Sequence, residues 1–376
     1  MSKALLLLFF CFSLLVLLPA PQYHFWKLTI GVTELGLFFA FITFLIYTLI
    51  FLQTGFNTFF SIITIFSIIL YLLPTFHAKS MASDLKYQLK SAFGEAQHVD
   101  YEGFELNKSY YNKNYSHVIT DSIVYKSASD ISLSFDHYYS TNIQHKKRPC
   151  IISVHGGAWS SGDNKMFVNF DKHLADLGYV VIDITYRLAP KHLFPAPVDD
   201  VFDVYKYIVE NAEGLNVDTA NIFLLGRSAG GQIATLAAEK LGKDKIKGII
   251  SIYTPHDMVW GYSLPGNPLI MDSRKVLEDY LGGTYEEAKA NFHAASTVEN
   301  ANENMPPILM IHGKRDEMVA YEHNLHLIEK LKQLRVPYYL LSFPYATHGC
   351  DYFLNGPSGQ LSCYAIDYFC KSFSEK

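Results

Sequence analysis

A serine framed by two glycines is the first feature of this sequence that could do chemistry. Residues 226–230 read Gly-Arg-Ser-Ala-Gly, directly after an apolar run and directly before a segment with helical patterning. At such a strand-to-helix turn the hydroxyl of Ser228 lies at a helix N-terminus, whose partial positive charge favours a developing anion. Gly226 and Gly230 leave room for the tight turn. This arrangement predicts nucleophilic attack on a carbonyl carbon, although a passive serine in a glycine-rich turn fits the same pattern.

Two further residues have the types and positions that such a nucleophile needs. A serine hydroxyl is a poor nucleophile until a base takes its proton, and the base needs an acid that fixes its tautomer. Asp316 and His348 each follow a predicted buried strand, at the carboxyl end where parallel sheets place their ligands. The order Ser228, Asp316, His348 along the chain is the order expected for a nucleophile at this kind of turn. The sequence therefore predicts a catalytic triad of these three residues.

The acid and the base each have competitors in the sequence. Glu317 is adjacent to Asp316 and could take its place as the acid. His348 is preferred as the base because it lies in the loop after the last predicted strand. The alternative histidines end a strand or lie on a predicted helix, where core or surface roles suit them better: His312, His323 and His326.

A glycine pair upstream supplies groups that would stabilise a negatively charged carbonyl oxygen. Acyl transfer needs hydrogen-bond donors aimed at that oxygen. Gly156 and Gly157 directly follow a short apolar strand, and glycines let backbone N–H groups face a site without obstruction. The N–H groups of Gly156, Gly157 and Ala229 are therefore predicted to form the oxyanion hole. Trp159 is predicted to line the acyl pocket, and His155 to hold the loop by a hydrogen bond.

The elements around these residues predict a mostly parallel sheet covered by helices on both faces. Short apolar strands alternate with amphipathic helices over residues 116–376, which are predicted to form one catalytic domain. Val118–Tyr125 and Ile131–Tyr139 alternate in polarity and predict a hairpin at the sheet edge. Further strands are predicted at Cys150–Val154, Tyr179–Thr185, Asn221–Leu225, Ile246–Tyr253, Ile308–His312 and Tyr338–Phe343. Helices are predicted near Lys165–Leu177, Val198–Asn211, Gln232–Leu241, Glu322–Leu334 and Gly359–Phe373.

The stretch from Pro255 to Met305 is too long for a plain connection between two strands. We expect it to form a cap over the nucleophile, because it leaves the sheet at the carboxyl end of a strand. It carries many apolar side chains, which could form either the packed underside of the cap or a wall around the ligand, and Trp260 among them is predicted to contact the substrate. An apolar roof favours a small-molecule ester with an apolar acyl or alkyl group.

The first 75 residues contain three uncharged apolar runs, Ala4–Ala20, Leu35–Leu52 and Phe56–Leu73. Each has about the length of a short membrane span, and none carries the polar stripe of a core helix. Residues 1–75 are therefore predicted to form a multi-pass membrane region of two or three helices in contact with the lipid bilayer. The first run also fits a cleaved signal peptide. Residues 76–115 are predicted to connect this region to the catalytic domain.

Very short loops are expected to join the apolar runs, around Pro21–Lys27 and Gln53–Gly55. With three spans, Lys27 lies on the same membrane side as the lysines that follow the third run. The positive-inside rule then favours the cytoplasmic side for the catalytic domain. Cleavage of the first run would argue for the opposite side.

Neither the charge nor the cysteine content of the chain indicates a nucleic-acid partner, a disulfide framework or a zinc site. The chain has 376 residues, a formal net charge of −5 and five cysteines. It has no long basic block, so no nucleic-acid partner is indicated. The cysteine count is odd and no pair has the spacing of a metal site, so neither a disulfide framework nor a zinc site is predicted.

Four motifs together resemble the carboxylesterases related to hormone-sensitive lipase. They are His155–Trp159, Tyr186–Pro190, Phe194–Pro197 with Asp199 and Asp200, and Gly226–Gly231. Residues 155–163 also resemble the corresponding segment of isoprenylcysteine-methylesterase-type and feruloyl-esterase-like hydrolases. The resemblance implies an α/β-hydrolase fold from about Ser116 onward, ester hydrolysis without a cofactor or metal, and the triad and oxyanion hole given above. Arg227 stands where lipase-like members usually have aspartate, which leaves the subfamily and its substrate open.

The function predicted from the sequence is that of a membrane-anchored serine carboxylesterase that works through an acyl-enzyme. An amidase, formamidase or peptidase could use the same triad. A catalytically silent hydrolase domain used for adhesion would usually lack the serine or the histidine, and both are present. A transporter role for the membrane region has Glu34 as its one polar hint.

Overall fold

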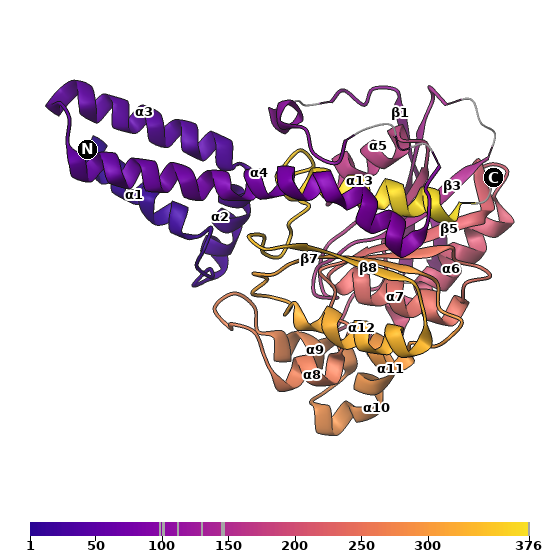
Figure 1. Ribbon diagram of the computed structural model, residues 1–376. Helices are drawn as coiled ribbons and strands as arrows, with labels where there is room; N and C mark the ends of the chain where they lie inside the picture. The colour runs from indigo at the N-terminus through magenta and orange to yellow at the C-terminus, as the bar shows by residue number, and fades with distance from the viewer. Residues whose placement is uncertain (98, 100–101, 111–112, 129–130, 144–146, 375–376) are drawn as a thin grey trace.

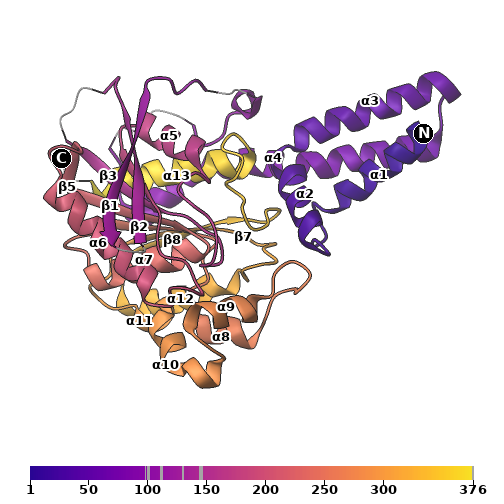
Figure 2. The ribbon, with the colours of Figure 1, turned by 180° about the vertical axis from the view of Figure 1, so that it is seen from behind.

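The chain forms a helical region at its N-terminal end and a large domain built on one eight-stranded sheet (Figure 1). The computed structural model describes residues 1–97, 99, 102–110, 113–128, 131–143 and 147–374. The helical region extends from the large domain, and the same arrangement is visible from behind (Figure 2).

The sheet is mostly parallel, which confirms the predicted fold class. Its strands are β1 (Val118–Ala128), β2 (Ile131–Ser140), β3 (Arg148–Val154), β4 (Val180–Ile184), β5 (Val217–Arg227), β6 (Gly248–Ile252), β7 (Ile308–Gly313) and β8 (Tyr338–Phe343). Their order is β1-β2-β4-β3-β5-β6-β7-β8. The β1–β2 hairpin at the edge is antiparallel and β2 pairs antiparallel with β4, while the remaining pairs are parallel. β4, β6 and β7 are buried along their whole length, and most of their residues are apolar.

Helices cover both faces of the sheet. One face carries α6 (Ala196–Glu210), α7 (Ala229–Leu241) and α12 (Glu322–Leu334), whose apolar sides join one core cluster. The other face carries α5 (Val168–Asp176) and α13 (Pro357–Phe373), which join a second cluster. The sheet is therefore packed between two separate hydrophobic cores. Because the central strands are parallel, their carboxyl ends lie at the same edge of the sheet.

The insertion between β6 and β7 folds as four short helices. They are α8 (Met258–Ser263), α9 (Ser273–Leu281), α10 (Tyr285–Ala295) and α11 (Thr297–Asn300). Polar residues begin three of these helices. The side chains of Asp257 and Asp272 accept N-terminal N–H groups of α8 and α9, and Thr284 forms a capping box with Glu287 at α10.

The N-terminal region contains α1 (Ser2–Leu14), α2 (Tyr23–Glu34), α3 (Gly36–Thr54) and α4 (Thr58–Phe93). By length and composition, α3 and α4 could cross a membrane, and only 28% and 39% of their most apolar windows are buried. α1 has 13 residues, or about 20 Å of helix, which is less than the roughly 30 Å of a bilayer core. The first apolar run therefore forms a helix shorter than a span, and two candidate spans remain.

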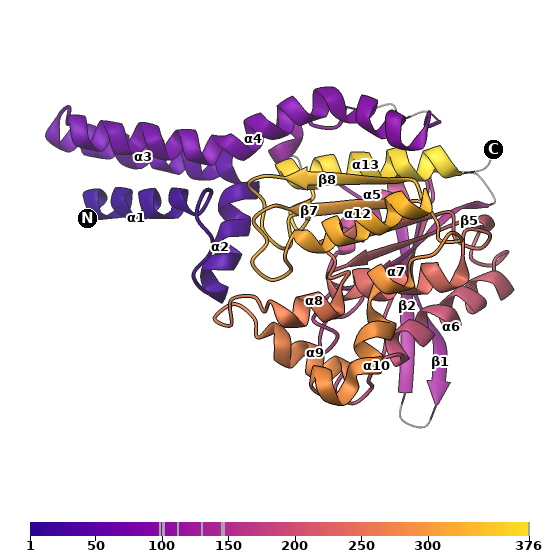
Figure 3. The same cartoon turned by 60° about the horizontal axis from the view of Figure 1, so that its bottom comes forward.

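Two expectations for this region differ from the structure. The sequence predicts a loop over Pro21–Lys27, yet this range contains the start of α2. This helix lies between the large domain and the apolar bundle formed by α1, α3 and the first half of α4 (Figure 3). The segment 76–115 was expected as a connector, yet α4 continues through its start to Phe93. Leu85 and Leu89 are buried in the core beside α13, and the Phe93 ring lies 4.8 Å from that of Phe369. Residues 98, 100, 101, 111 and 112 of the expected connector lie outside the described residues.

Candidate active site

Ser228 lies in a strained turn between β5 and α7. Its φ of 54° and ψ of −122° are rare for a residue with a side chain. A Cβ atom at Gly226 would lie 2.2 Å from the carbonyl oxygen of Gly230, and one at Gly230 would lie 2.2 Å from that of Val154. Both positions therefore require glycine. The tight turn holds the Ser228 hydroxyl at the carboxyl end of β5 and the N-terminus of α7.

Ser228, His348 and Asp316 form one chain of hydrogen bonds. The Oγ atom of Ser228 lies 3.0 Å from Nε2 of His348. Nδ1 of His348 lies 2.7 Å from Oδ2 of Asp316. This geometry allows His348 to accept the serine proton while Asp316 holds the opposite ring nitrogen protonated. The loops after β5, β7 and β8 bring the three residues together.

Asp316 is fully buried and is held by several donors. Its Oδ1 accepts the backbone N–H groups of Met318 and Val319 at 2.9 and 2.8 Å. Its Oδ2 also lies 3.1 Å from Nε2 of His312. Burial by itself raises the pKa of a carboxyl group, but the charge of His348 and the hydrogen bonds from both histidines hold the pKa of Asp316 below its ordinary value. The acid therefore remains ionised beside its histidine.

The alternative acid and bases have other contacts. Oε1 of Glu317 accepts the backbone N–H of Ala20 at 2.8 Å, and its Oε2 accepts the hydroxyl of Thr347. His323 accepts the backbone N–H of Asp257 at 3.1 Å, and burial lowers the pKa of His323 to about 3. His326 pairs with the Asp257 carboxylate at 2.9 Å, and the ring of His312 supports Asp316 as described above.

The loop after β3 brings backbone groups to the serine. Gly156 and Gly157 line the same cavity as Ser228 and Ala229. Gly157 has a φ of +120°, and a Cβ atom there would lie 1.9 Å from the carbonyl oxygen of Ser161, so this position excludes a side chain. The His155 ring stacks on Tyr186 with centroids 4.3 Å apart. The loop is therefore held in one conformation next to the nucleophile.

Arg227, next to the nucleophile, is buried in a network that reaches the histidine loop. Its guanidinium carbon lies 4.0 Å from the ring centroid of Phe167 and 4.4 Å from that of Phe170. Its Nε donates to Oδ2 of Asp351 at 2.6 Å, and the hydroxyl of Tyr253 donates to Oδ1 of Asp351 at 2.7 Å. The Tyr253 ring in turn lies 4.5 Å from that of His348, between centroids. Arg227 thus has a structural role that its usual aspartate counterpart could not fill.

A cavity of about 540 Å³ opens above the triad. Trp159 belongs to its lining, with its indole N–H bonded to Gln232 at 3.0 Å and its ring stacked on Tyr280. Trp260 was predicted to contact the substrate, but the structure places it elsewhere. Its ring packs on those of His323 and His326, with centroids 4.9 and 4.7 Å away. The insertion contributes other apolar residues to the lining: Met258, Leu264, Met271, Val276 and Leu277.

The sequence prediction missed three lining residues from the N-terminal region. Tyr23, Trp26 and Ile30 of α2 reach the same cavity as Ser228 and His348. They lie three and four residues apart, which is the spacing of one helix face. That spacing is the signal in the sequence for this wall, whereas the position of the segment between two apolar runs favours a short loop.

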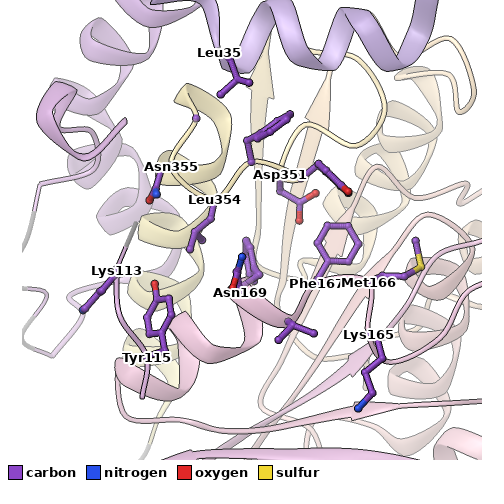
Figure 4. Close-up of a pocket in the computed structure, with 15 residues that line it drawn as sticks. Leu35, Lys113, Tyr115, Lys165, Met166, Phe167, Asn169, Asp351, Leu354 and Asn355 are labelled. Carbon is purple, nitrogen blue, oxygen red and sulfur yellow. The ribbon is translucent and has the colours of Figure 1, made fainter. Parts of the chain in front are cut away.

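A second cavity of about 550 Å³ adjoins the first (Figure 4). The two share Met166, Phe167 and Tyr352 as lining residues. Figure 4 shows the Asp351 side chain in this cavity near Phe167, with Lys113 and Tyr115 at the far end. The buried Arg227–Asp351 pair therefore lies between the two cavities, with Asp351 lining one and Arg227 lining the other.

Within the described ranges, no group of three or more His, Cys, Asp or Glu side chains is arranged to hold a metal ion. Four of the five cysteines are buried, and Cys11 is exposed.

Comparison with known proteins identifies relatives of the large domain. The family described as BD-FAE matches residues 135–331, more than half of the chain. Esterase LipC of Mycobacterium tuberculosis is 29% identical over 242 residues, which cover 60% of this chain and 58% of LipC. An ethyl acetate hydrolase of Pseudomonas putida is 35% identical over 96 residues, or 25% of this chain and 30% of that protein. The chain thus spans less than two thirds of the length of these curated relatives.

Solved structures share the fold of the large domain. A bacterial heroin esterase superposes with a TM-score of 0.61 at 21% identity, covering 70% of this chain and 87% of that chain. An esterase of Pyrobaculum calidifontis superposes with a TM-score of 0.58 at 22% identity, covering 80% and 94%. The fold is therefore that of the α/β-hydrolases.

Proposed function

Because the chain belongs to the family described as BD-FAE, we propose that it is a serine carboxylesterase that hydrolyses carboxylic esters through an acyl-enzyme on Ser228. The observation that carries the proposal is the unbroken contact chain from Ser228 Oγ through His348 to Asp316, at 3.0 and 2.7 Å. The esterase names of its relatives agree with this reading.

The proposed reaction has two halves. In the first, Ser228 Oγ attacks the ester carbonyl carbon and its proton passes to Nε2 of His348. His348 gives that proton to the departing alcohol as the ester C–O bond breaks. In the second half, His348 takes a proton from water and the resulting hydroxide attacks the acyl carbon. The bond from that carbon to Ser228 Oγ then breaks, and His348 returns the proton to Oγ. Ester and water are consumed, and a carboxylic acid and an alcohol are released.

Backbone donors would stabilise the charge that develops on the carbonyl oxygen. We assign this role to the N–H groups of Gly156, Gly157 and Ala229, which adjoin Ser228 in the cavity lining. The apolar lining from the insertion suits an ester with an apolar acyl or alkyl group. Trp159 would contact that group from the side of the glycine loop.

We also propose that α3 and the apolar first half of α4 anchor the protein in a membrane as a hairpin. Both helices expose large apolar side chains that water would solvate poorly, including Phe41, Leu49, Ile62 and Ile65. Lys27 and the lysines of the second half of α4 then share one side, which favours the cytoplasmic face for the catalytic domain.

Labelling with a fluorophosphonate probe tests the esterase proposal. The full chain in detergent should be labelled, and Ser228→Ala should not be. Without the probe, the same preparation should turn over a nitrophenyl ester faster than the matching anilide. Absence of labelling in the folded protein, or faster turnover of the anilide, would contradict an esterase.

Extraction from membranes tests the anchor. The expressed full chain should remain in the membrane pellet after alkaline carbonate and after high salt, and should be released by detergent. Release by carbonate alone would contradict an integral anchor, whatever the enzyme hydrolyses.

A further inference from the structure

We propose that the substrate is an ester resident in the bilayer, whose long acyl or alkyl chain reaches Ser228 through a mouth walled by α2. This inference rests on the proposed function and adds to it a substrate class and a route into the site. Its starting point is that Tyr23, Trp26 and Ile30 line the same cavity as the catalytic serine.

α2 lies directly beside the catalytic histidine. The indole Nε1 of Trp26 donates a hydrogen bond to the carbonyl oxygen of His348 at 3.1 Å. A Cβ atom at Gly349 would lie 3.3 Å from Cδ1 of Ile30, so the helix and the histidine loop are in close contact. A segment located between two apolar runs therefore forms part of the wall of the active site.

The chain leading into α2 is hydrogen-bonded to the rim of the cavity. The backbone N–H of Ala20 donates to Glu317 at 2.8 Å, one residue after the triad acid. The backbone N–H of Tyr23 donates to the carbonyl oxygen of Leu269, in the insertion, at 3.1 Å. These bonds fix α2 against both sides of the cavity mouth, so its position is a built feature of the site.

The rim of the mouth is apolar and exposed. Leu264 and Tyr352 line the cavity and are 62% and 61% exposed, and Leu269, bonded to Tyr23, is 70% exposed. Exposed apolar side chains gathered around a ligand cavity mark a surface that meets another apolar phase. We take this apolar phase to be a bilayer, because α2 connects the rim to the apolar bundle (Figure 3).

The residues of α2 suit the interface between lipid and water. Tyrosine and tryptophan are enriched at that level of a membrane, and Tyr23 and Trp26 lie on the side of α2 that faces the cavity. The Lys27 ammonium lies 4.7 Å from the centroid of the Tyr23 ring, and lysines near membrane surfaces extend their charge towards the headgroups. The cavity mouth is therefore at the height of the headgroups.

This placement selects for esters with long chains. An ester dissolved in the bilayer can pass its carbonyl group to Ser228 while its chain moves from lipid into an apolar cavity. The cavity, at about 540 Å³, has the size of an ordinary ligand pocket, so the rest of a long chain remains in the lipid. Each additional CH₂ favours partition of the ester from water into the bilayer by about fourfold, so esters with long chains concentrate where the mouth lies.

The first experiment uses the full chain in phosphatidylcholine vesicles that contain either 4-methylumbelliferyl oleate or 4-methylumbelliferyl acetate. Ile30→Ala removes part of the α2 wall, and Phe25→Ala is the matched control on the same helix, outside the cavity lining. Ile30→Ala should lower kcat/KM for the oleate at least fivefold more than for the acetate. Phe25→Ala should change the ratio between the two esters by less than twofold.

The second experiment locates α2 without relying on activity. The chain contains three tryptophans, so the fluorescence due to Trp26 is the difference between the unchanged chain and Trp26→Phe. Phosphatidylcholine brominated near the headgroup should quench this fluorescence more strongly than phosphatidylcholine brominated near the chain end. Equal or absent quenching would overturn the proposed membrane-level mouth.

The outcomes separate this inference from the proposed function. If acetate and oleate are both hydrolysed through Ser228 but Ile30→Ala changes them equally, the bilayer route is wrong and the esterase proposal stands. If neither ester is hydrolysed by the folded, reconstituted chain, the esterase proposal fails and the inference fails with it.

Discussion

The guanidinium of Arg227 and the carboxylate of Asp351 form a salt bridge with side chains 1% and 0% exposed, at 2.6 Å between Nε and Oδ2. Arg227 precedes Ser228, and Asp351 follows His348 by three residues. The pair therefore connects the two loops whose separation determines the distance from Ser228 Oγ to His348 Nε2. Phe167 and Phe170 cover the guanidinium on its faces and keep water away.

Removing one member of this pair should destabilise the protein strongly. Asp351→Asn keeps the size of the side chain but removes the carboxylate that is hydrogen-bonded to the buried Arg227 charge, and breaking such a pair costs about 3–5 kcal/mol. We expect a marked fall in the thermal unfolding midpoint, measured in detergent. The double variant Arg227→Met with Asp351→Leu, which removes both charges, should be more stable than Asp351→Asn. A double variant as unstable as the single one would show that charge is not the cause.

Triad substitutions should separate the acid from its neighbour. Ser228→Ala and His348→Ala should lower kcat for a nitrophenyl ester by about 10⁴-fold or more, because triad members act as a unit. Asp316→Asn should have a comparable effect through the wrong imidazole tautomer. Glu317→Gln, which changes a contact to Ala20 and Thr347, should retain most of kcat. A large loss of kcat in Glu317→Gln, with kcat largely retained in Asp316→Asn, would refute the assignment of the acid.

A methyl group at Gly157 should damage the donor loop. Gly157→Ala requires a strained φ and a Cβ atom within 1.9 Å of the Ser161 carbonyl oxygen. The loop must move, and the loss of one donor to the oxyanion costs about 10²–10³-fold in kcat. Gly214→Ala is the matched control, because its Cβ atom would be 3.7 Å from the nearest backbone oxygen. Unchanged turnover by Gly157→Ala would rule out this loop as a source of donors.

The rise of kcat/KM with acyl length should depend on the side chain of Val276 and not on that of Trp260. Val276→Ala alters the cavity lining and should flatten the rise in kcat/KM from acetyl to hexanoyl esters. Trp260→Ala removes contacts with His323 and His326 and should lower stability by about 1–3 kcal/mol while leaving the rise in place. If Trp260→Ala instead flattens the rise in kcat/KM with acyl length, Trp260 contacts the substrate, as the sequence predicts.

Glu34 should make stability depend on pH. Its side chain is buried between α2 and α13, where Oε2 accepts the backbone N–H of Ser358 at 3.0 Å. Burial raises the pKa of Glu34 from 4.5 to about 8. The folded state therefore binds a proton that the unfolded state releases, so stability falls as pH rises from about 4.5 to about 8. Glu34→Gln should raise the unfolding midpoint more at pH 8 than at pH 5, and an equal rise at both would contradict the shift.

The large domain could be predicted from sequence because its signals are local. The strands β3 to β8 are short apolar runs bounded by polar residues, and their predicted bounds agree with the structure to within a few residues. Ser228, Asp316 and His348 were predictable because each follows a strand end in a set order along the chain. Their mutual distances come from the parallel sheet, which brings strand ends to one edge.

The contributions that the sequence did not reveal depend on contacts between distant segments. Nothing near Trp26 indicates that its indole would meet the carbonyl oxygen of His348, which lies 322 positions further along the chain. The position of Trp260 outside the cavity lining was not predictable either. Its apolar ring suits either a ligand or a packed interface, and only the position of α12 decides between them.

The continuity of α4 has a mechanical consequence. Its 36 residues form one helix, about 54 Å long, which starts among the apolar helices and ends packed into the enzyme core at Phe93. A rod that is shared in this way acts as a strut, so the catalytic domain cannot swing freely as it would on a flexible tether. In the proposed membrane-anchored form, the height of Ser228 above the lipid surface would then be constant, and the search for substrate would be confined to two dimensions.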